Sequence, residues 1–496
     1  MAQEGGRKVI VIGAGLGGIS AAISLAQQGY AVEIFEKNGK IGGKLNELRR
    51  DGYVFDLGPS ILTLPHLFER LFSRSGRRMS DYVPIRRVRP HWRNFFEDGA
   101  VFDFVPEEAA QSAELAKLGP GLDGPFKDYL AYSGALYDLV GRGYFEKGLD
   151  TVAEFIRFYE PSALFKFDLL RTMHGGVSRF IREPRLRDAL DFFIKYVGSS
   201  AYDAPAFMNC LPTIQFRHDL WYVDGGLYNL ARGLGRFLEE LGIRVHLEHE
   251  VTEIRKDGDR VSGIEARGVF HPADVVVSNM EVIPAHRELL KASPDEMKRL
   301  ERFAPACSGL VIDLGLDCRY PQLAHHNFFF SGNQQAHFKA VFRDHVLPHD
   351  PTLYVVAASR TDPTVAPEGC DGLKILPHIP PIDPAHPLAD ADYRALRDRV
   401  LDKLERMGLK DLRKHIVVEH LWTPVDIQRE YYSNRGAIYG VVCDRWRNFA
   451  FKAPKQSRRY PNLFFTGGSV NPGGGMPMVV LCGQNVCQRI VEWDRA

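Results

Sequence analysis

The sequence lacks an excess of charge of either sign, because 63 basic side chains stand against 62 acidic ones and the formal net charge is +1. Such a balance argues against a dedicated nucleic-acid-binding protein. The seven cysteines are scattered, and no pair shows C-x-x-C spacing. That scatter indicates neither a disulfide framework nor a zinc site. H-E-x-x-H and G-x-S-x-G motifs are also missing. We therefore predict no nucleic-acid partner and no bound metal.

The sequence also shows no secretory signal, since MAQEGGRKVIVIGAG has no apolar stretch followed by a small-residue cleavage site. Two uncharged stretches, residues 9–32 and 462–488, are long enough to cross a bilayer, for which about 20 residues suffice. Glycines interrupt both stretches, and glycine-rich backbone cannot face lipid with its polar groups unpaired. We therefore predict neither a signal peptide nor a transmembrane helix. The sequence carries no signal for an oligomeric state.

The chain begins with the pattern of a strand–turn–helix–strand unit. Residues 8–12 (KVIVI) are a β-branched run that ends at a glycine, which predicts a buried strand. Residues 19–28 carry apolar side chains on one helical face, and residues 31–35 predict a second strand. The unit has the size of a βαβ module, about 30 residues. At 496 residues, the whole chain is long enough for at least two domains.

The turn of this unit is rich in glycine. Gly13, Gly15 and Gly18 stand in G-x-G-x-x-G spacing between the predicted strand and helix. In that context the first glycine allows a tight turn, the second lets backbone approach a pyrophosphate, and the third permits close helix–strand packing. Leu16 and Gly17 lie between them, just before the predicted helix, whose N-terminal N–H groups can bind phosphate. The turn therefore predicts dinucleotide binding.

Glu36 ends the second strand about 20 residues after the turn, where a carboxylate can accept hydrogen bonds from a ribose. A surface acid at a strand end is the alternative. Lys37 follows it, and Gly43 belongs to a second glycine pair that lets backbone approach a ligand again. Lys44 beside this pair either contacts phosphate or lies in solvent. The arrangement favours FAD over a nicotinamide, and FAD supplies redox chemistry that side chains lack.

Nucleotide-type elements recur in two later blocks. Their patterns predict a helix at 227–241, strands at 244–247, 251–254, 273–277 and 462–465, and a closing helix from Met476. Between the blocks, residues 81–220 are aromatic, mainly helical in pattern and rich in arginine. Either these are core helices with solvated basic faces, or they form a basic, aromatic surface that lies on an anionic membrane leaflet. Residues 289–449 mix strand and helix patterns.

Two adjacent histidines, His325 and His326, precede the run Phe328, Phe329 and Phe330. Neighbouring residues of a strand point to opposite faces, so this pair does not favour shared metal ligation. One histidine facing a substrate cavity and a purely structural role are the two remaining interpretations. The phenylalanines are more typical of a core than of a ligand site.

These motifs as a set resemble the bacterial FAD-dependent carotenoid desaturases and oxidases of the amine-oxidase superfamily. The resemblance spans nearly the whole chain and is carried by FDLGPSILTLP (55–65), MSDYV (79–83), FIKYVGSSAYDAP (193–205), LWYVDGG (220–226), SNMEVIP (278–284), YPQLAHHNFFF (320–330), SNRGAIYG (433–440) and GGSVNPGGGMPMV (467–479).

The resemblance implies an α/β fold with a Rossmann-like FAD-binding domain assembled from residues 1–80, 221–288 and 450–496. Residues 81–220 would form a helical region that associates with a membrane, and residues 289–449 an inserted α+β substrate domain. The family's pattern implies FAD contacts for Gly13, Gly15, Leu16, Gly17, Gly18, Glu36, Lys37, Gly43 and Lys44, for Val251 on the adenine side, and for Gly467, Gly468, Met476, Pro477 and Met478 beside the flavin.

The members of the family that this chain most resembles oxidise a terminal methyl group of a C30 carotenoid, 4,4'-diaponeurosporene or diapolycopene, to the aldehyde with O2, as in staphyloxanthin-type pathways. The resemblance thus implies a carotenoid substrate and a peripheral position on the cytoplasmic side of the cell membrane. A diapophytoene-type desaturase is the alternative within the family. A flavin-free lipid-binding protein on the same fold and an amine oxidase are alternatives of other classes. No acid–base residue is implied.

Overall fold

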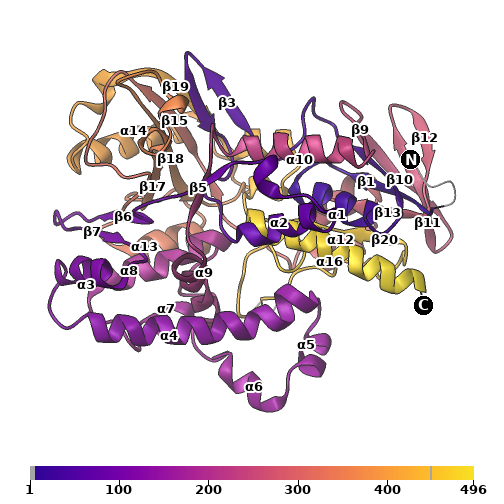
Figure 1. The fold of residues 1–496 in the computed structure, drawn as a ribbon, viewed down its shortest axis with the longest axis horizontal. Helices are drawn as coiled ribbons and strands as arrows, with labels where there is room; N and C mark the ends of the chain where they lie inside the picture. The colour runs from indigo at the N-terminus through magenta and orange to yellow at the C-terminus, as the bar shows by residue number, and fades with distance from the viewer. Residues whose placement is uncertain (1–5, 447–449, 496) are drawn as a thin grey trace.

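The computed structural model describes residues 6–446 and 450–495 (Figure 1). A five-stranded parallel sheet has the order β20 (Leu463–Phe465), β13 (Val275–Ser278), β1 (Lys8–Ile12), β2 (Ala31–Phe35) and β9 (Arg244–His246). Helices cover this sheet, so its central strands are buried runs of valine and isoleucine. Its strands come from three stretches that lie far apart in the sequence.

The start of the chain follows the predicted pattern closely. Strands β1 and β2 have the predicted bounds, and β20 begins one residue later than predicted. Helix α1 (Leu16–Ala26) begins three residues earlier than predicted, because the chain turns helical directly after Gly15, whose backbone is extended. Gly17 and Gly18 are therefore part of the helix and not of the turn.

The closing helix α16 (Met476–Arg495) packs along α1. A β-carbon on Gly483 of α16 would lie 2.6 Å from the backbone oxygen of Gly17 and 2.6 Å from the backbone nitrogen of Ala21. Only a glycine allows this approach, since real β-carbons do not come so close to backbone atoms. The two ends of the chain are thus joined in one core. Helices α2 (Pro65–Ser73) and α10 (Tyr228–Glu240) flank α1 (Figure 1).

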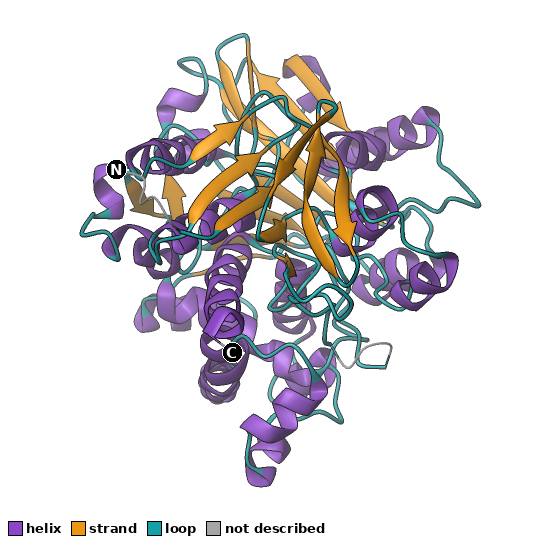
Figure 2. Ribbon diagram, turned by 90° about the vertical axis from the view of Figure 1, so that its right-hand side faces the viewer, coloured by secondary structure: helices purple, strands orange, loops and turns teal. Residues whose placement is uncertain are grey.

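A second, larger sheet is shown in Figure 2. Its order is β19 (Ile416–Trp422), β15 (Val311–Leu316), β18 (Asp371–Ile379), β17 (Leu353–Val356), β16 (His326–Phe329), β6 (Trp92–Phe95) and β7 (Val101–Phe104), with β14 (Ser308–Gly309) paired to β18. Its pairs are antiparallel except for β16 with β6. Helix α14 (Asp390–Arg406) packs its buried side chains against the hydrophobic cluster of this sheet.

Residues 81–220 begin with strands β5 (Ile85–Arg87), β6 and β7, and become helical only from Glu108. The turn between β6 and β7 contains Asp98–Gly99, with Gly99 at a positive φ of 84°. A D-G pair between aromatic runs is a hairpin signal that the helical reading of this segment overlooked. The helices then form one group in the lower half of Figure 1: α3 (Glu108–Ala116), α4 (Asp123–Val140), α5 (Val152–Phe158), α6 (Pro161–Lys166), α7 (Met173–Val177), α8 (Pro184–Asp191) and α9 (Leu211–His218).

Smaller elements complete the fold. They are the three-stranded antiparallel sheet of β10 (Val251–Asp257), β11 (Arg260–Ala266) and β12 (Val269–Pro272), the hairpin of β3 (Glu47–Arg50) and β4 (Tyr53–Asp56), strand β8 (Trp221–Val223) paired with β5, and helices α11 (Val282–Pro284), α12 (Pro294–Leu300), α13 (Gln334–Lys339) and α15 (Pro424–Tyr431). Among the described residues, no helix combines the length and apolar character that crossing a bilayer requires.

Candidate functional site

One continuous cavity opens where the parallel strands end. Its wall includes Ile12 at the end of β1, Glu36 directly after β2 and Asn279 directly after β13. The cavity extends from there past the N-terminus of α16 to the apolar side chains of the helical group. Ligands of parallel α/β sheets bind at this edge, outside the carboxyl ends of the strands.

The glycine turn exposes bare backbone to the cavity. Gly13 has a positive φ of 92°, and its N–H donates to the Phe35 carbonyl at 2.7 Å. A β-carbon on Gly15 would lie 2.6 Å from Asn279 Nδ2, and one on Gly17 would lie 2.7 Å from Asn279 Oδ1. Any larger side chain would therefore displace Asn279 or fill the cavity. Leu16 lies between these glycines and also lines the cavity.

Gly18 does not line the cavity. A β-carbon there would lie 2.1 Å from the backbone oxygen of Gly13, so this glycine lets α1 pack against the turn. That position agrees with the packing role predicted for the third glycine of the motif. Of the residues predicted to bind the cofactor, all others lie in the cavity wall.

Glu36 is buried, with 5% of its surface exposed, and is held by backbone groups. Its Oε2 accepts a hydrogen bond from the N–H of Ala14 at 2.7 Å, and its Oε1 accepts one from the N–H of Asn38 at 2.9 Å. Burial raises the pKa of Glu36 above its ordinary value, while these two backbone bonds act in the opposite direction. Each oxygen keeps a lone pair for a ligand hydroxyl. Val251 lies in the same part of the wall, since the His249 N–H donates to the Glu36 carbonyl at 2.8 Å.

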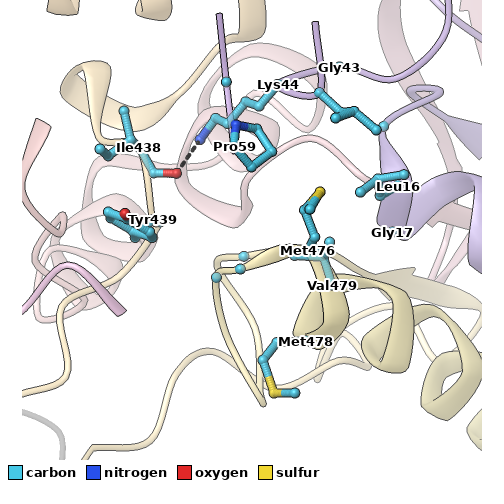
Figure 3. Close-up of a pocket in the computed structure, with 18 of the residues that line it drawn as sticks. Leu16, Gly17, Gly43, Lys44, Pro59, Ile438, Tyr439, Met476, Met478 and Val479 are labelled. Atoms are coloured by element: carbon cyan, nitrogen blue, oxygen red, sulfur yellow. Dashed lines mark hydrogen bonds between the residues drawn. The ribbon is translucent and has the colours of Figure 1, made fainter. Parts of the chain in front are cut away.

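The second glycine pair lies beside the first turn. Gly43 has a positive φ of 57°, and a β-carbon there would lie 3.1 Å from Cα of Gly15. Lys44 Nζ donates to Glu281 Oε1 and to the Ala437 carbonyl, both at 3.0 Å, and approaches the Ile438 carbonyl at 3.5 Å (Figure 3). Lys44 is therefore not a free lysine, because protein oxygens hold its ammonium while its side chain stays partly exposed.

Lys37 is held in a similar way at the edge of the cavity. Its Nζ donates to the Arg429 carbonyl at 2.8 Å and lies 4.1 Å from the ring centroid of Tyr432. Both lysines thus bring segments near residue 430 against the predicted nucleotide site. Their contact with the cofactor itself stays a prediction.

The closing segment forms a further part of the cavity wall, beside the glycine turn. Gly467 and Gly468 line it, with Gly467 at a positive φ of 99°, and so do Met476, Pro477 and Met478 at the start of α16. Figure 3 shows Met476 between Leu16 and Pro59, whereas Met478 points away from them. The N-terminus of a 20-residue helix faces the cavity and favours negative charge there.

Several cavity residues were not predicted from the sequence. Asn279 follows β13, so its place at the carboxyl end of a parallel strand could have revealed it. Lys195 and Lys374 interrupt the apolar runs FFIKYV and DGLKILPHI, and a charge inside a buried run is the signal they carry. Lys374 Nζ donates to the Gly58 carbonyl and, at 3.1 Å, to Ser60 Oγ.

The two adjacent histidines are buried outside the cavity. His325 Nδ1 is 2.7 Å from Thr361 Oγ1, and His326 Nδ1 is 2.9 Å from the Tyr354 hydroxyl. Burial lowers the pKa of His325 to about 3, so the ring is neutral. These contacts favour the structural role for both histidines over a position in the substrate cavity.

A possible ligand set for an ion lies elsewhere, at Asp317, Cys318 and His415, whose ligand atoms lie within 4.8 Å of one another. His415 Nδ1 is already paired with Asp317 at 2.8 Å. The group does not line the cavity, and we assign it no ion.

Comparison with known proteins identifies the class. Residues 16–491 match the model of the family described as flavin containing amine oxidoreductase. The chain belongs to this family and is an FAD-dependent oxidoreductase, as the glycine turn and Glu36 indicate. It is 56% identical to a 4,4'-diapolycopene oxygenase of Methylomonas sp over 493 residues, 99% of both chains. It is 49% identical to a 4,4'-diaponeurosporene oxygenase of Staphylococcus aureus (strain USA300) over 490 residues, 98% of both chains.

Two solved structures illustrate the fold. Putrescine oxidase bound to putrescine has a TM-score of 0.66 at 16% identity, covering 98% of this chain and 99% of that one. A fatty acid isomerase from P. acnes has a TM-score of 0.64 at 16% identity, covering 97% and 98%. The predicted α/β fold of the flavin amine-oxidase type and the FAD cofactor are confirmed.

Proposed function

We propose that this protein oxidises a terminal methyl group of a C30 carotenoid, 4,4'-diaponeurosporene or diapolycopene, through the alcohol to the aldehyde, with O2 as the source of oxygen. Relatives with the names 4,4'-diapolycopene oxygenase and 4,4'-diaponeurosporene oxygenase support this proposal, because each is about half identical to this chain over nearly its full length.

The observation that carries the proposal is the apolar continuation of the nucleotide cavity. Beyond the glycine turn, its wall includes the apolar or aromatic side chains of Val140, Tyr144, Phe207, Leu211 and Ile214, which come from the helical group. A polyene has no polar atoms, so such a wall can bind it by excluding water alone. The same space therefore suits a dinucleotide at one end and a long hydrocarbon at the other.

The residues present fit FAD. The bare backbone of Gly15 and Gly17 leaves room for a pyrophosphate, Glu36 offers lone pairs for a ribose, and the start of α16 faces the space for the ring system. Bound flavin supplies the two-electron redox chemistry that side chains lack. The chain's own part is to hold the cofactor, to align the substrate end beside α16 and to exclude water from the reacting atoms.

We further propose that the protein associates peripherally with the cytoplasmic side of the membrane, through α5, α6 and the residues after them. Phe165 is 88% exposed, Leu170 is 92% exposed and Ile156 is 59% exposed, a grouping of apolar surface that an isolated soluble protein has little use for. The basic residues Arg157 and Lys166 lie among them and suit anionic lipid headgroups.

This apolar surface follows the cavity wall directly in the chain. Tyr144 and Phe145 line the cavity from the π-helical segment Gly141–Lys147, which extends α4 and precedes α5 in the chain. In Figure 1, α5 and α6 project from the body of the molecule. A carotenoid dissolved in lipid could thus enter the cavity without crossing water. We also propose the three-segment division into FAD-binding, helical and substrate regions, at the bounds predicted from the sequence except that β6 and β7 join the sheet of the substrate region.

Expression in cells that accumulate 4,4'-diaponeurosporene or diapolycopene tests the function. The mass of the new pigment should correspond to a carotenoid aldehyde. A pigment that has only lost hydrogen would instead identify a desaturase of the diapophytoene type. Protein that purifies without flavin and cannot be loaded with FAD would favour the lipid-binding alternative.

A further inference from the structure

Among the described residues, two buried lysines of the cavity wall, Lys195 and Lys452, form no hydrogen bond or ion pair through Nζ, and Lys195 is the one whose Nζ lies among aromatic rings. Lys195 lies in the short helix Phe192–Val197 and is 4% exposed. Its Nζ is 4.0 Å from the ring centroid of Tyr354, 4.3 Å from that of Phe328 and 4.6 Å from that of Trp92. The ring of Tyr196 follows at 5.0 Å. Aromatic rings therefore enclose an amine that is costly to bury.

In the part of the chain that the structure describes, no group forms a hydrogen bond or ion pair with this nitrogen. Burial alone acts on the pKa of Lys195, which lies well below the ordinary value for lysine. An uncharged amine can both donate and accept a hydrogen bond. Lys44 and Lys374 also line the cavity but are occupied by carbonyl, carboxylate or hydroxyl oxygens.

The position of Lys195 connects it with the end of the cavity where α16 begins. A β-carbon on Gly475 would lie 3.7 Å from the carbonyl oxygen of Tyr196, the residue after Lys195. Gly475 directly precedes Met476, the first residue of α16. Lys195 is thus part of the cavity wall, and the backbone of the next residue lies beside the loop that precedes α16.

We propose that the Lys195 amine is the hydrogen-bonding contact for the oxygen atom of the partly oxidised substrate end, and that it retains the primary alcohol for oxidation to the aldehyde. This inference rests on the proposed function, because it names the polar contact of the same site. The amine accepts a hydrogen bond from the alcohol hydroxyl and donates one to the aldehyde oxygen.

The physical reason is the difference between the two substrate ends. A methyl end leaves the buried amine unpaired, whereas a hydroxyl end gives it a partner in a space where water does not compete. A site with a buried polar group discriminates in favour of the ligand that pairs with it. The protein should therefore bind the alcohol more tightly than the hydrocarbon, which keeps the intermediate from leaving early.

The test measures the binding of two probes to flavin-loaded protein in detergent micelles, by the shift of polyene absorption. The probes are 4,4'-diaponeurosporene and its terminal primary alcohol. We expect the wild type to bind the alcohol about ten-fold more tightly. Lys195→Met should lose this preference with the hydrocarbon Kd unchanged, and Lys195→Gln, which keeps a donor and an acceptor, should regain part of it. A Lys195→Met protein that still prefers the alcohol overturns the proposal, as does a wild type without preference.

A second buried lysine of the cavity wall, Lys452, provides the matched control. Lys452→Met should keep the preference for the alcohol. If Lys452→Met loses that preference and Lys195→Met keeps it, the proposal is overturned. In cells, Lys195→Met should raise the ratio of alcohol to aldehyde about ten-fold. If no oxygenated carotenoid forms in wild-type cells, the proposed function fails, while the ratio of the two affinities still decides the role of Lys195.

Discussion

The side chain of Asn279 occupies the place that a β-carbon on Gly17 would need, with its Oδ1 2.7 Å from that position. A backbone atom of Gly467 lies 3.1 Å from the same position. The end of β13, the start of α1 and the closing segment thus meet around one glycine, although the sequence separates them by hundreds of residues.

This meeting predicts the effect of Gly17→Ala. The added methyl group should displace Asn279 and Gly467 and narrow the space for the pyrophosphate, so the variant should retain FAD at least ten-fold more weakly. The ratio of flavin absorbance to protein absorbance after gel filtration measures this. Gly124→Ala is the control, because a β-carbon at Gly124 of α4 has no neighbour within 4 Å. Equal flavin content in both variants would contradict the account.

A buried ion pair fastens the helical group to the closing segment. Lys455 Nζ lies 2.5 Å from Asp150 Oδ1, both side chains are at most 2% exposed, and Arg489 Nε is 3.3 Å from the other Asp150 oxygen. Lys455→Met leaves a buried carboxylate short of a partner and should lower the free energy of unfolding by about 3–5 kcal/mol. Denaturant unfolding measures it.

The double variant Lys455→Met with Asp150→Asn should recover part of that loss, because it removes the unpaired charge as well. If the loss of unfolding free energy in the double variant equals the sum of the losses in the two single variants, Lys455 and Asp150 do not interact energetically.

Asp56 should make stability depend on pH. Burial raises the pKa of Asp56 to about 7, and its Oδ1 accepts a hydrogen bond from the Leu227 N–H at 2.9 Å. Because the folded state has the higher pKa, the contribution of Asp56 to stability is complete below the pKa of the unfolded chain and is lost as pH rises through about 7. Asp56→Asn keeps the acceptor and removes the titration.

The difference in unfolding free energy between wild type and Asp56→Asn should therefore fall between pH 4 and 7, by up to about 1.4 kcal/mol per pH unit. Denaturant unfolding at several pH values measures it, with Asp128→Asn as the exposed control. Parallel curves for wild type and Asp56→Asn would show that Asp56 has no raised pKa.

The apolar surface of α5 and α6 should bind lipid. Phe165→Ser with Leu170→Ser should lower the fraction of protein that sediments with vesicles of phosphatidylcholine and phosphatidylglycerol by ten-fold or more, since each side chain contributes about 1.5–3 kcal/mol when buried in lipid. Val269→Ser with Phe270→Ser is the control, because these side chains are 55% and 48% exposed on β12. If both double variants lose vesicle binding equally, the proposal that α5 and α6 form the membrane-binding surface is wrong.

Local chemistry made the start of the chain predictable. Strands β1 and β2 follow from β-branched runs, and the turn follows from glycines that must take unusual φ values or approach other backbone, as Gly13 and Gly15 do. The start of the closing helix at Met476 was predicted correctly, because the glycines before it separate the helix from the preceding strand. Helix α1 was begun too late, since its first glycines were assigned to the turn.

Contacts between distant segments could not be predicted, because no single stretch of the sequence contains a pattern for them. Lys44 was assigned either to phosphate or to solvent, and only the fold brings Glu281 to 3.0 Å from its ammonium, 237 residues away in the chain. The aromatic rings around Lys195 come from three separate stretches in the same way. The hairpin of β6 and β7, by contrast, carried a D-G signal that the sequence already offered.

Labelled oxygen tests the central claim most directly. Purified, FAD-loaded protein is incubated with diapolycopene under 18O2, and the product is reduced at once with borohydride to prevent exchange of the aldehyde oxygen with water. Mass spectrometry should then find a carotenoid alcohol that carries 18O at its terminal carbon. A product that has lost hydrogen without gaining oxygen, or one that carries only unlabelled oxygen, would contradict the account.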